Sequence, residues 1–167
     1  MDIYYQKLQP VHARQYREIR LESLKLYPGH FGSKYEEQKK LKELLFESII
    51  KQEDTQNFVI GAFDKNELIG ICAFTERNGY NLMQTGSLIQ VYVKKAYSGR
   101  KIGLNLVQKT IAEAVKVRDI QKIILEVNKS NYAAIRVYEQ AGFEPFNLEA
   151  EQDTLDGLLM IRKASLH

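Results

Sequence analysis

The sequence has few of the residues that stabilise small secreted domains or bind metals. Cys72 is its one cysteine, which excludes an internal disulfide and a cysteine cluster for a metal. His12 and His30 stand apart from other ligand-type residues, so no metal site is predicted. No apolar run reaches the roughly 18 residues of a membrane helix, and the first residues, MDIYYQKLQP, lack the apolar segment of a secretory signal. These absences predict a cytoplasmic protein without membrane contact.

The chain also has little excess charge. Its net charge of +3 is too small to indicate a nucleic-acid partner by itself. The distribution is uneven, because residues 94–122 contain eight Lys or Arg against only Glu113 and Asp119. This part of the surface is expected to favour an anion. A nucleic-acid-binding function ranks last, since only Tyr92 and Tyr97 lie nearby in sequence to stack on bases.

The hydrophobic pattern predicts one domain over residues 1–167, with no repeat or flexible linker to divide it. Apolar spacings of three and four residues predict helices, and short β-rich runs bounded by turn residues predict strands. The expected strands are 2–8, 57–63, 67–76, 87–93, 122–127, 143–149 and 154–162, and the expected helices are 12–26, 35–50, 102–117 and 131–141. This order is typical of an α/β (α+β) fold with a mixed sheet.

The segment VYVKKAYSGRKIGLNLV, residues 91–107, runs from a strand through a short basic loop into a helix. The first backbone N–H groups of a helix have no partners within it and attract negative charge. Gly99 and Gly103 allow close approach of a ligand, and Arg100 and Lys101 add positive charge. We therefore expect a phosphate or pyrophosphate here, the alternative being a solvated turn with chance basic residues. The segment contains neither GxxxxGK(S/T) nor GxGxxG, which excludes two common nucleotide-binding loops.

A second segment, ILEVNKSNYAAIRVYEQAGFEP (residues 124–145), carries a more specific pattern. Together with the loop it resembles the GNAT superfamily of N-acetyltransferases, in which Asn-x-x-Ala-x-x-Leu/Val-Tyr-x-x-x-Gly-Phe recurs. The matching residues are Asn131, Ala134, Val137, Tyr138, Gly142 and Phe143. The coenzyme loop of that family, Gln/Arg-x-x-Gly-x-Gly/Ala, is matched less well. Ser98 and Lys101 replace its first and middle residues, and only Gly103 fits.

The resemblance implies a single-domain GNAT-like fold, with a mixed, mostly antiparallel sheet of six to seven strands that is splayed in the middle and flanked by about four helices. It implies an enzyme that moves an acetyl group from acetyl-CoA to a primary amine of a small molecule or peptide. Transfer would be direct, within a ternary complex and without a metal. The alternative is a catalytically weak acyl-CoA-binding or regulatory module, which the altered Ser98 and Lys101 favour. Pairing of the C-terminal strands between subunits would give a homodimer.

By the same resemblance, the coenzyme contacts groups along both segments. The strand residues Val91, Tyr92 and Val93 are expected to offer backbone groups to the acetyl and pantetheine part. The residues expected to surround the pyrophosphate are Gly99, Arg100, Lys101, Ile102, Gly103 and Leu104. Asn131 resembles the side chain that contacts the coenzyme arm, and Tyr138 resembles the general acid that protonates the leaving thiolate. The alternative for Tyr138 is a core aromatic on the apolar face of its helix.

Glu126 lies in an otherwise apolar strand, on the face opposite Leu125 and Val127. A carboxylate there is costly unless it is paired, hydrated or functional, and burial would raise its pKa toward that of a useful base. The tripeptide LEV is similar to the ribosomal-protein alanine N-acetyltransferases, where this Glu serves as the base. Glu126 is therefore predicted to act as the base or to bind the substrate, and the alternative is a paired structural carboxylate. Many family members use a chain of water molecules instead.

Overall fold

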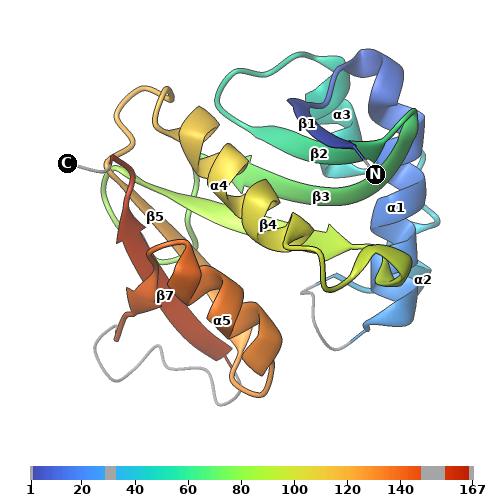
Figure 1. The fold of residues 1–167 in the computed structure, drawn as a ribbon. Coiled ribbons are helices and arrows are strands. Elements are labelled where there is room, and N and C mark those ends of the chain that lie inside the picture. The colour runs from blue at the N-terminus through green and yellow to red at the C-terminus, as the bar shows by residue number, and fades with distance from the viewer. Residues whose placement is uncertain (1, 29–32, 148–156, 166–167) are drawn as a thin grey trace.

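The computed structural model describes residues 2–28, 33–147 and 157–165 (Figure 1). Seven strands of this part form one sheet in the spatial order β1-β2-β3-β4-β5-β7-β6. The strands are β1 (Ile3–Lys7), β2 (Phe58–Asp64), β3 (Glu67–Thr75), β4 (Thr85–Val93), β5 (Lys122–Asn128), β6 (Glu144–Pro145) and β7 (Gly157–Lys163). The helices are α1 (Ala13–Leu26), α2 (Tyr35–Gln38), α3 (Leu45–Lys51), α4 (Ile102–Ala114) and α5 (Tyr132–Gln140), with short 3₁₀ helices at Pro10–His12 and Lys95–Tyr97.

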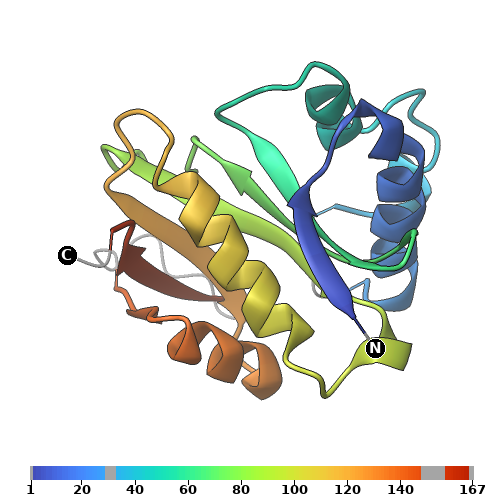
Figure 2. The same cartoon turned by 45° about the horizontal axis from the view of Figure 1, so that its top comes forward.

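Both faces of the sheet are covered, and each cover has its own hydrophobic core. On one face, α4 and α5 pack against the sheet through residues such as Leu106 and Tyr138. On the other face, α1 and α3 contribute residues such as Tyr16 and Phe46. Figure 2 shows α4 lying across the sheet, with α1 on the far side of the strands. Burial on both faces explains why β2 and β3 are nearly continuous apolar runs rather than alternating ones.

The sheet opens in its middle, between β4 and β5. These two strands are parallel, whereas the other neighbouring pairs of the described sheet are antiparallel. Their pairing covers three positions: Thr85 with Lys122, Gly86 with Ile123, and Ser87 with Ile124. Beyond them β4 follows β3 to Val93, while β5 follows β7 to Asn128. The structure therefore confirms the mixed, mostly antiparallel and splayed sheet.

A β-bulge lies in β4 where the strands separate. Ile71 pairs with Tyr92, but Ala73 pairs with Ile89, so the register between β3 and β4 shifts between these pairs. Gln90 sits in the bulge with a φ of 56°, in the left-handed region. A bulge leaves an extra residue outside the ladder and bends its strand. The bend turns this part of β4 away from regular pairing at the edge of the opening.

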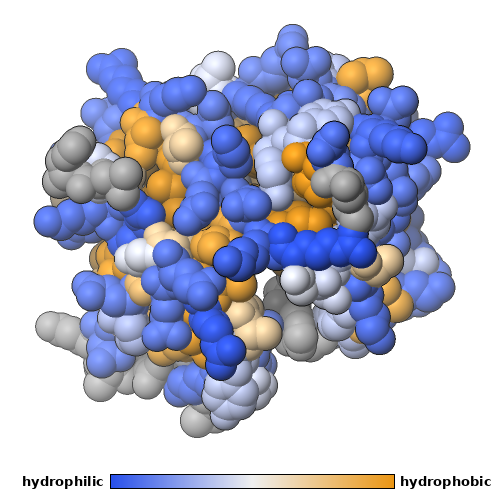
Figure 3. All heavy atoms as spheres, in the orientation of Figure 1, coloured by the Kyte–Doolittle hydropathy of each residue, from blue (hydrophilic) through white to orange (hydrophobic). Residues whose placement is uncertain are grey.

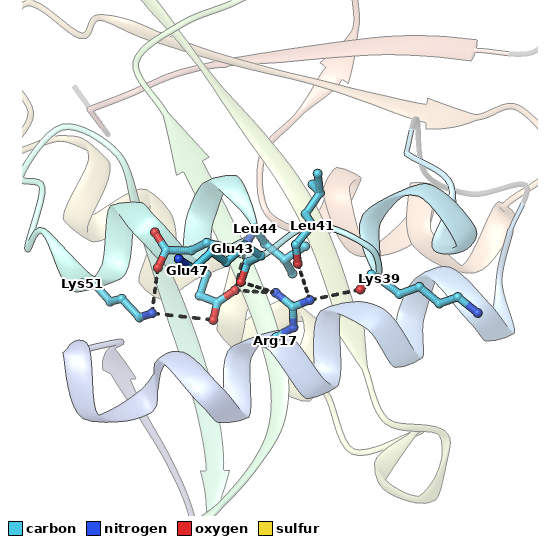
Figure 4. Close-up of polar contacts among 8 residues, drawn as sticks. Arg17, Lys39, Leu41, Glu43, Leu44, Glu47 and Lys51 are labelled. Atoms are coloured by element: carbon cyan, nitrogen blue, oxygen red, sulfur yellow. Dashed lines mark hydrogen bonds and ion pairs between the residues drawn. The ribbon is translucent and has the colours of Figure 1, made fainter.

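One helix over residues 35–50 was expected, and this prediction is wrong. The segment forms α2 and α3 with an irregular stretch between them. Arg17 of α1 explains the break, because its guanidinium donates to the carbonyls of Lys39 (3.3 Å) and Leu41 (2.7 Å), as Figure 4 shows. It also pairs with the Glu47 carboxylate at 2.9 Å. The same Glu47 oxygen accepts a hydrogen bond from the Leu44 amide at 2.9 Å, which begins α3.

Arg17→Ala is expected to lower the free energy of unfolding by about 2 kcal/mol, because the buried Glu47 carboxylate and two carbonyls lose a charged donor. The side chain of Arg17 is 24% exposed and that of Glu47 is 9% exposed, so water replaces these bonds poorly. Urea denaturation measures the change. Arg14→Ala is the control, since Arg14 is 91% exposed and forms only a 3.6 Å surface pair with Glu18. Equal destabilisation by the two variants would contradict this explanation of the break.

The C-terminal part differs in extent from the expected strands 143–149 and 154–162. It forms β6 and β7, and residues 148–156 of the expected strands lie outside the described residues. β6 is at one edge of the described sheet. Pairing of this edge between subunits stays a prediction. Among the helices that the structure describes, none has the length and apolar character needed to cross a bilayer.

Candidate functional site

A cavity of about 170 Å³ lies where β4 and β5 diverge. It is lined by β4, β5, the first turn of α4 and the buried side of α5; the lining residues are Leu88, Ile89, Gln90, Val91, Gly103, Leu125, Glu126, Val127, Asn128, Asn131, Ala134, Val137 and Tyr138. Five residues of the predicted site meet here: Val91, Gly103, Glu126, Asn131 and Tyr138. They come from four separate elements, so the splay of the sheet creates the site.

The N-terminal end of α4 opens toward this cavity at Gly103. The first hydrogen bond of the helix is donated by the Asn105 amide to the Lys101 carbonyl at 3.0 Å. The amides of Ile102, Gly103 and Leu104 therefore precede the helical ladder and are directed out of the helix end. Such amides, with the positive end of the helix dipole, favour a bound anion. Figure 3 shows hydrophilic side chains over the loop that leads into α4, beside a hollow in the surface.

The loop before α4 takes a sharp left-handed turn. Gly99 has a φ of 80° and Lys101 has a φ of 60°. Lys101 is thus a non-glycine residue in a backbone conformation that costs it roughly 1–2 kcal/mol. The family pattern has Gly at this position, and the left-handed backbone explains why. The lysine keeps the turn in spite of this cost.

Gly103 is not required by the packing of the fold. A Cβ placed on it would meet only the Cγ2 atom of Val93, at 3.9 Å, among the described residues. That distance is an ordinary van der Waals contact. Because Gly103 also lines the cavity, its missing side chain keeps space open there. A glycine at this position is therefore not explained by close packing, and ligand contact at Gly103 stays a prediction.

Several residues of the predicted coenzyme site have side chains that pack in a core or form hydrogen bonds away from the cavity. Tyr92 is 6% exposed on the α1 face, and its hydroxyl donates to Glu22 at 2.6 Å. Ile102 is buried in the core, and Val93 and Leu104 pack against that core. These residues offer a ligand only main-chain groups. Arg100 lies with its guanidinium 5.7 Å from the centre of the Tyr97 ring, on the loop surface.

Tyr138 is both a core residue and a cavity residue. It is 8% exposed, and its ring meets that of Phe143 edge to face at 6.2 Å. Its hydroxyl forms no hydrogen bond with any residue that the structure describes. Burial, with a smaller contribution from nearby Cys72, raises the pKa of Tyr138 well above its ordinary value. The side chain is therefore a neutral phenol on the lining of the cavity.

Asn131 caps α5 and lines the cavity at the same time. Its Oδ1 accepts a hydrogen bond from the Ala134 amide at 3.2 Å, which is the usual N-cap contact. This bond fixes the orientation of the side-chain amide. The Nδ2 group can only donate, and contact with the coenzyme arm stays a prediction.

Glu126 is exposed, so its carboxylate stays in contact with solvent. The alternation of β5 is as expected, since Leu125 and Val127 are buried on the α4 face and Glu126 points to the other face. That face is open here because β4 has already diverged. The Tyr80 hydroxyl donates to Glu126 Oε2 at 3.1 Å, so the carboxylate is exposed and also hydrogen-bonded.

Two residues at or beside the cavity, Gln90 and Tyr80, were not predicted from the sequence. Gln90 accepts a hydrogen bond from the buried Tyr16 hydroxyl at 2.6 Å and lines the cavity. The sequence feature that could have indicated Gln90 is that it is the one polar residue in the apolar run LIQVYV, residues 88–93. Tyr80 lies between the expected strands 67–76 and 87–93, and its place in the sequence does not say where its side chain points. Among the described residues, no group of His, Cys, Asp or Glu is arranged to hold a metal ion.

Comparisons with known proteins agree with this geometry. The model of the "Acetyltransferase (GNAT) family" matches residues 15–143. A GNAT acetyltransferase structure from Streptococcus pneumoniae is 18% identical, with a TM-score of 0.75 over 97% of this chain and 99% of that chain. The PaiA N-acetyltransferase of Thermoplasma acidophilum, in complex with coenzyme A, is 24% identical, with a TM-score of 0.73 over 98% and 99% of the two chains. These likenesses show the fold.

A curated relative is similar over a shorter stretch. N-alpha-acetyltransferase 30 of Dictyostelium discoideum is 28% identical over 82 residues, which are 49% of this chain and 43% of that protein. The match thus spans less than half the length of this relative. The family match, in contrast, covers most of the chain and includes most of α1, the loop before α4 and Tyr138. The chain belongs to the acetyltransferase (GNAT) family.

Proposed function

We propose that the chain transfers an acetyl group from acetyl-CoA to a primary amine of a small molecule or peptide, directly within a ternary complex. The observation that carries this proposal is the cavity between β4 and β5, where the open end of α4 and the buried phenol of Tyr138 meet. The open helix end suits the anionic phosphates of the coenzyme, and the phenol suits the leaving thiolate, which needs a proton. The coenzyme A complex of the PaiA structure supports the choice of ligand.

In this proposal the coenzyme lies along the opening, bound mostly by the main chain. The pyrophosphate accepts hydrogen bonds from the amides between Gly99 and Leu104, with Arg100 and Lys101 adding charge. The backbone of Val91–Val93 contacts the acetyl and pantetheine part beside the bulge. The Nδ2 group of Asn131 donates to a carbonyl of the coenzyme arm.

The reaction then needs a base, an attack and an acid. Glu126, directly or through water, accepts the proton of the acceptor ammonium. The free amine attacks the thioester carbonyl, and a C–N bond forms. As the tetrahedral intermediate collapses, the C–S bond breaks and the nitrogen releases its second proton to solvent. Tyr138 gives its proton to the departing coenzyme A sulfur and regains one from solvent. The products are the acetylated amine and coenzyme A.

Direct transfer is favoured over an acyl-enzyme, because the one thiol of the chain is unsuited to carry the acetyl group. Cys72 is completely buried, and burial raises the pKa of its thiol to about 12. The reactive form of cysteine is the thiolate, which is therefore scarce at neutral pH. Cys72 is also absent from the lining of the cavity.

Release of free thiol from acetyl-CoA, followed across a panel of amines, tests the proposal. The panel includes polyamines, amino acids, aminoglycosides, lysine and short peptides with free N-termini. Amine-dependent release, with mass spectrometry showing the acetylated amine, is the expected result. Coenzyme binding by calorimetry without release for any amine would instead indicate a binding module.

A further inference from the structure

The loop between β3 and β4 is a built structure rather than a loose connection. The side chain of Asn78 makes four hydrogen bonds within it. Its Nδ2 donates to the carbonyls of Leu82 and Thr85, both at 2.8 Å. Its Oδ1 accepts from the amides of Tyr80 (3.0 Å) and Leu82 (2.9 Å). One side chain thus ties both ends of the loop together and fixes the backbone of Tyr80.

The fixed loop places Tyr80 against Glu126, which lines the cavity. The hydroxyl of Tyr80 donates to Glu126 Oε2 at 3.1 Å, across 46 residues of sequence. Glu126 lines the cavity and projects from the face of β5 opposite to Leu125, which packs toward α4. The contact therefore bridges the β3–β4 loop and β5 over the opening of the sheet.

We propose that Tyr80 is a positioning residue, which holds the Glu126 carboxylate at the mouth of the cavity so that it meets the acceptor amine. This inference rests on the proposed function. An exposed glutamate samples several rotamers, and most of them direct the carboxylate away from the cavity. A hydrogen bond from a phenol that is itself fixed by Asn78 selects one of them. The β3–β4 loop then belongs to the acceptor site.

Kinetics of Tyr80→Phe test this role with the ring retained. We expect kcat to fall about tenfold, a part of the hundredfold or more that a general base contributes, while the KM for acetyl-CoA stays within twofold. Tyr4→Phe, which removes a partly exposed hydroxyl on β1, is the control and is expected to match the unmodified protein. An unchanged kcat in Tyr80→Phe would overturn the proposal.

Two further variants separate positioning from general damage. In the Glu126→Gln background, Tyr80→Phe is expected to have no additional effect, because both changes remove one coupled unit. Independent, multiplying effects would contradict the proposal. Asn78→Asp keeps the acceptor oxygen but removes the two Nδ2 donations, and is expected to reproduce the loss of kcat with Tyr80 still present. Full activity of Asn78→Asp would show that the loop does not hold the contact.

A measurement without turnover distinguishes failure of this inference from failure of the proposed function. Burial, and then the neighbouring Glu126, raise the pKa of Tyr80. Carbon-13 NMR of labelled tyrosines, with the Tyr80 signal assigned from Tyr80→Phe, follows this titration. Glu126→Gln is expected to lower the pKa of Tyr80, because a negative neighbour is removed. An unchanged titration would disprove the contact, whatever amines the protein acetylates.

Discussion

Tyr138→Phe is expected to lower kcat by about a hundredfold or more, the usual contribution of a general acid, while the free energy of unfolding changes by less than about 1 kcal/mol. The substitution keeps the ring that packs against Phe143. The hydroxyl forms no hydrogen bond with the described residues, so its loss leaves no hydrogen-bonding partner unsatisfied among them. Steady-state kinetics and urea denaturation measure the two effects, with Tyr4→Phe as the control.

The pH dependence follows from the burial of the same phenol. Because its pKa is raised, Tyr138 loses its proton only at a pH higher than the pH at which an ordinary tyrosine ionises. The acid form is therefore present throughout the neutral and mildly alkaline range, and activity is not expected to fall there through ionisation of Tyr138.

The Tyr138→Phe experiment can also contradict the acid role. If the variant retains full turnover, or loses turnover only because it unfolds, Tyr138 is a core aromatic without a catalytic role.

Gly103→Trp is expected to abolish coenzyme binding, with the dissociation constant raised at least about a hundredfold, or roughly 2.7 kcal/mol. The new side chain would start from open space, since only Val93 lies within 4 Å of the added Cβ, and would fill the cavity of about 170 Å³. The fold is expected to persist. Calorimetric titration with coenzyme A and circular dichroism measure both properties.

Lys101→Gly is the informative counterpart in the same turn. The φ of Lys101 is 60°, a conformation that glycine adopts without the cost of a Cβ. The variant is expected to bind coenzyme A within about threefold of the unmodified protein, because main-chain amides supply most of the phosphate contacts. If Lys101→Gly lost binding and Gly103→Trp kept it, the anion site would depend on the lysine charge instead.

The local hydrophobic pattern was sufficient to predict the helices and strands that are buried against the sheet. The apolar spacing of α4 and the continuous runs of β2 and β3 predicted these elements, because each is buried against neighbours in the expected order. Residues 35–50 show the same helical spacing, and the prediction failed there. The competing interaction comes from Arg17, which is 22 and 24 residues away from the carbonyls that it binds. No pattern within the segment contains that information.

The same distinction holds for the candidate site: residues in local motifs could be predicted, and features that depend on the whole fold could not. Residues 98–103 at the start of α4, Asn131 and Tyr138 lie in short motifs, and the fold brings Gly103, Asn131 and Tyr138 to one cavity. Alternation along β5 gave the correct face for Glu126 but not its exposure. Exposure depends on where β4 leaves β5, which is a property of the whole sheet. The hydrogen bond from Tyr80 to Glu126 depends on the folded β3–β4 loop, so it could not be predicted from the sequence either.

A crystal structure with bound acetyl-CoA tests the central claim most directly. The expected result is a pyrophosphate whose oxygens lie about 3 Å from amides between Gly99 and Leu104, with the thioester sulfur within hydrogen-bond reach of the Tyr138 hydroxyl. A coenzyme bound away from the N-terminal end of α4, or a sulfur far from Tyr138, would contradict it.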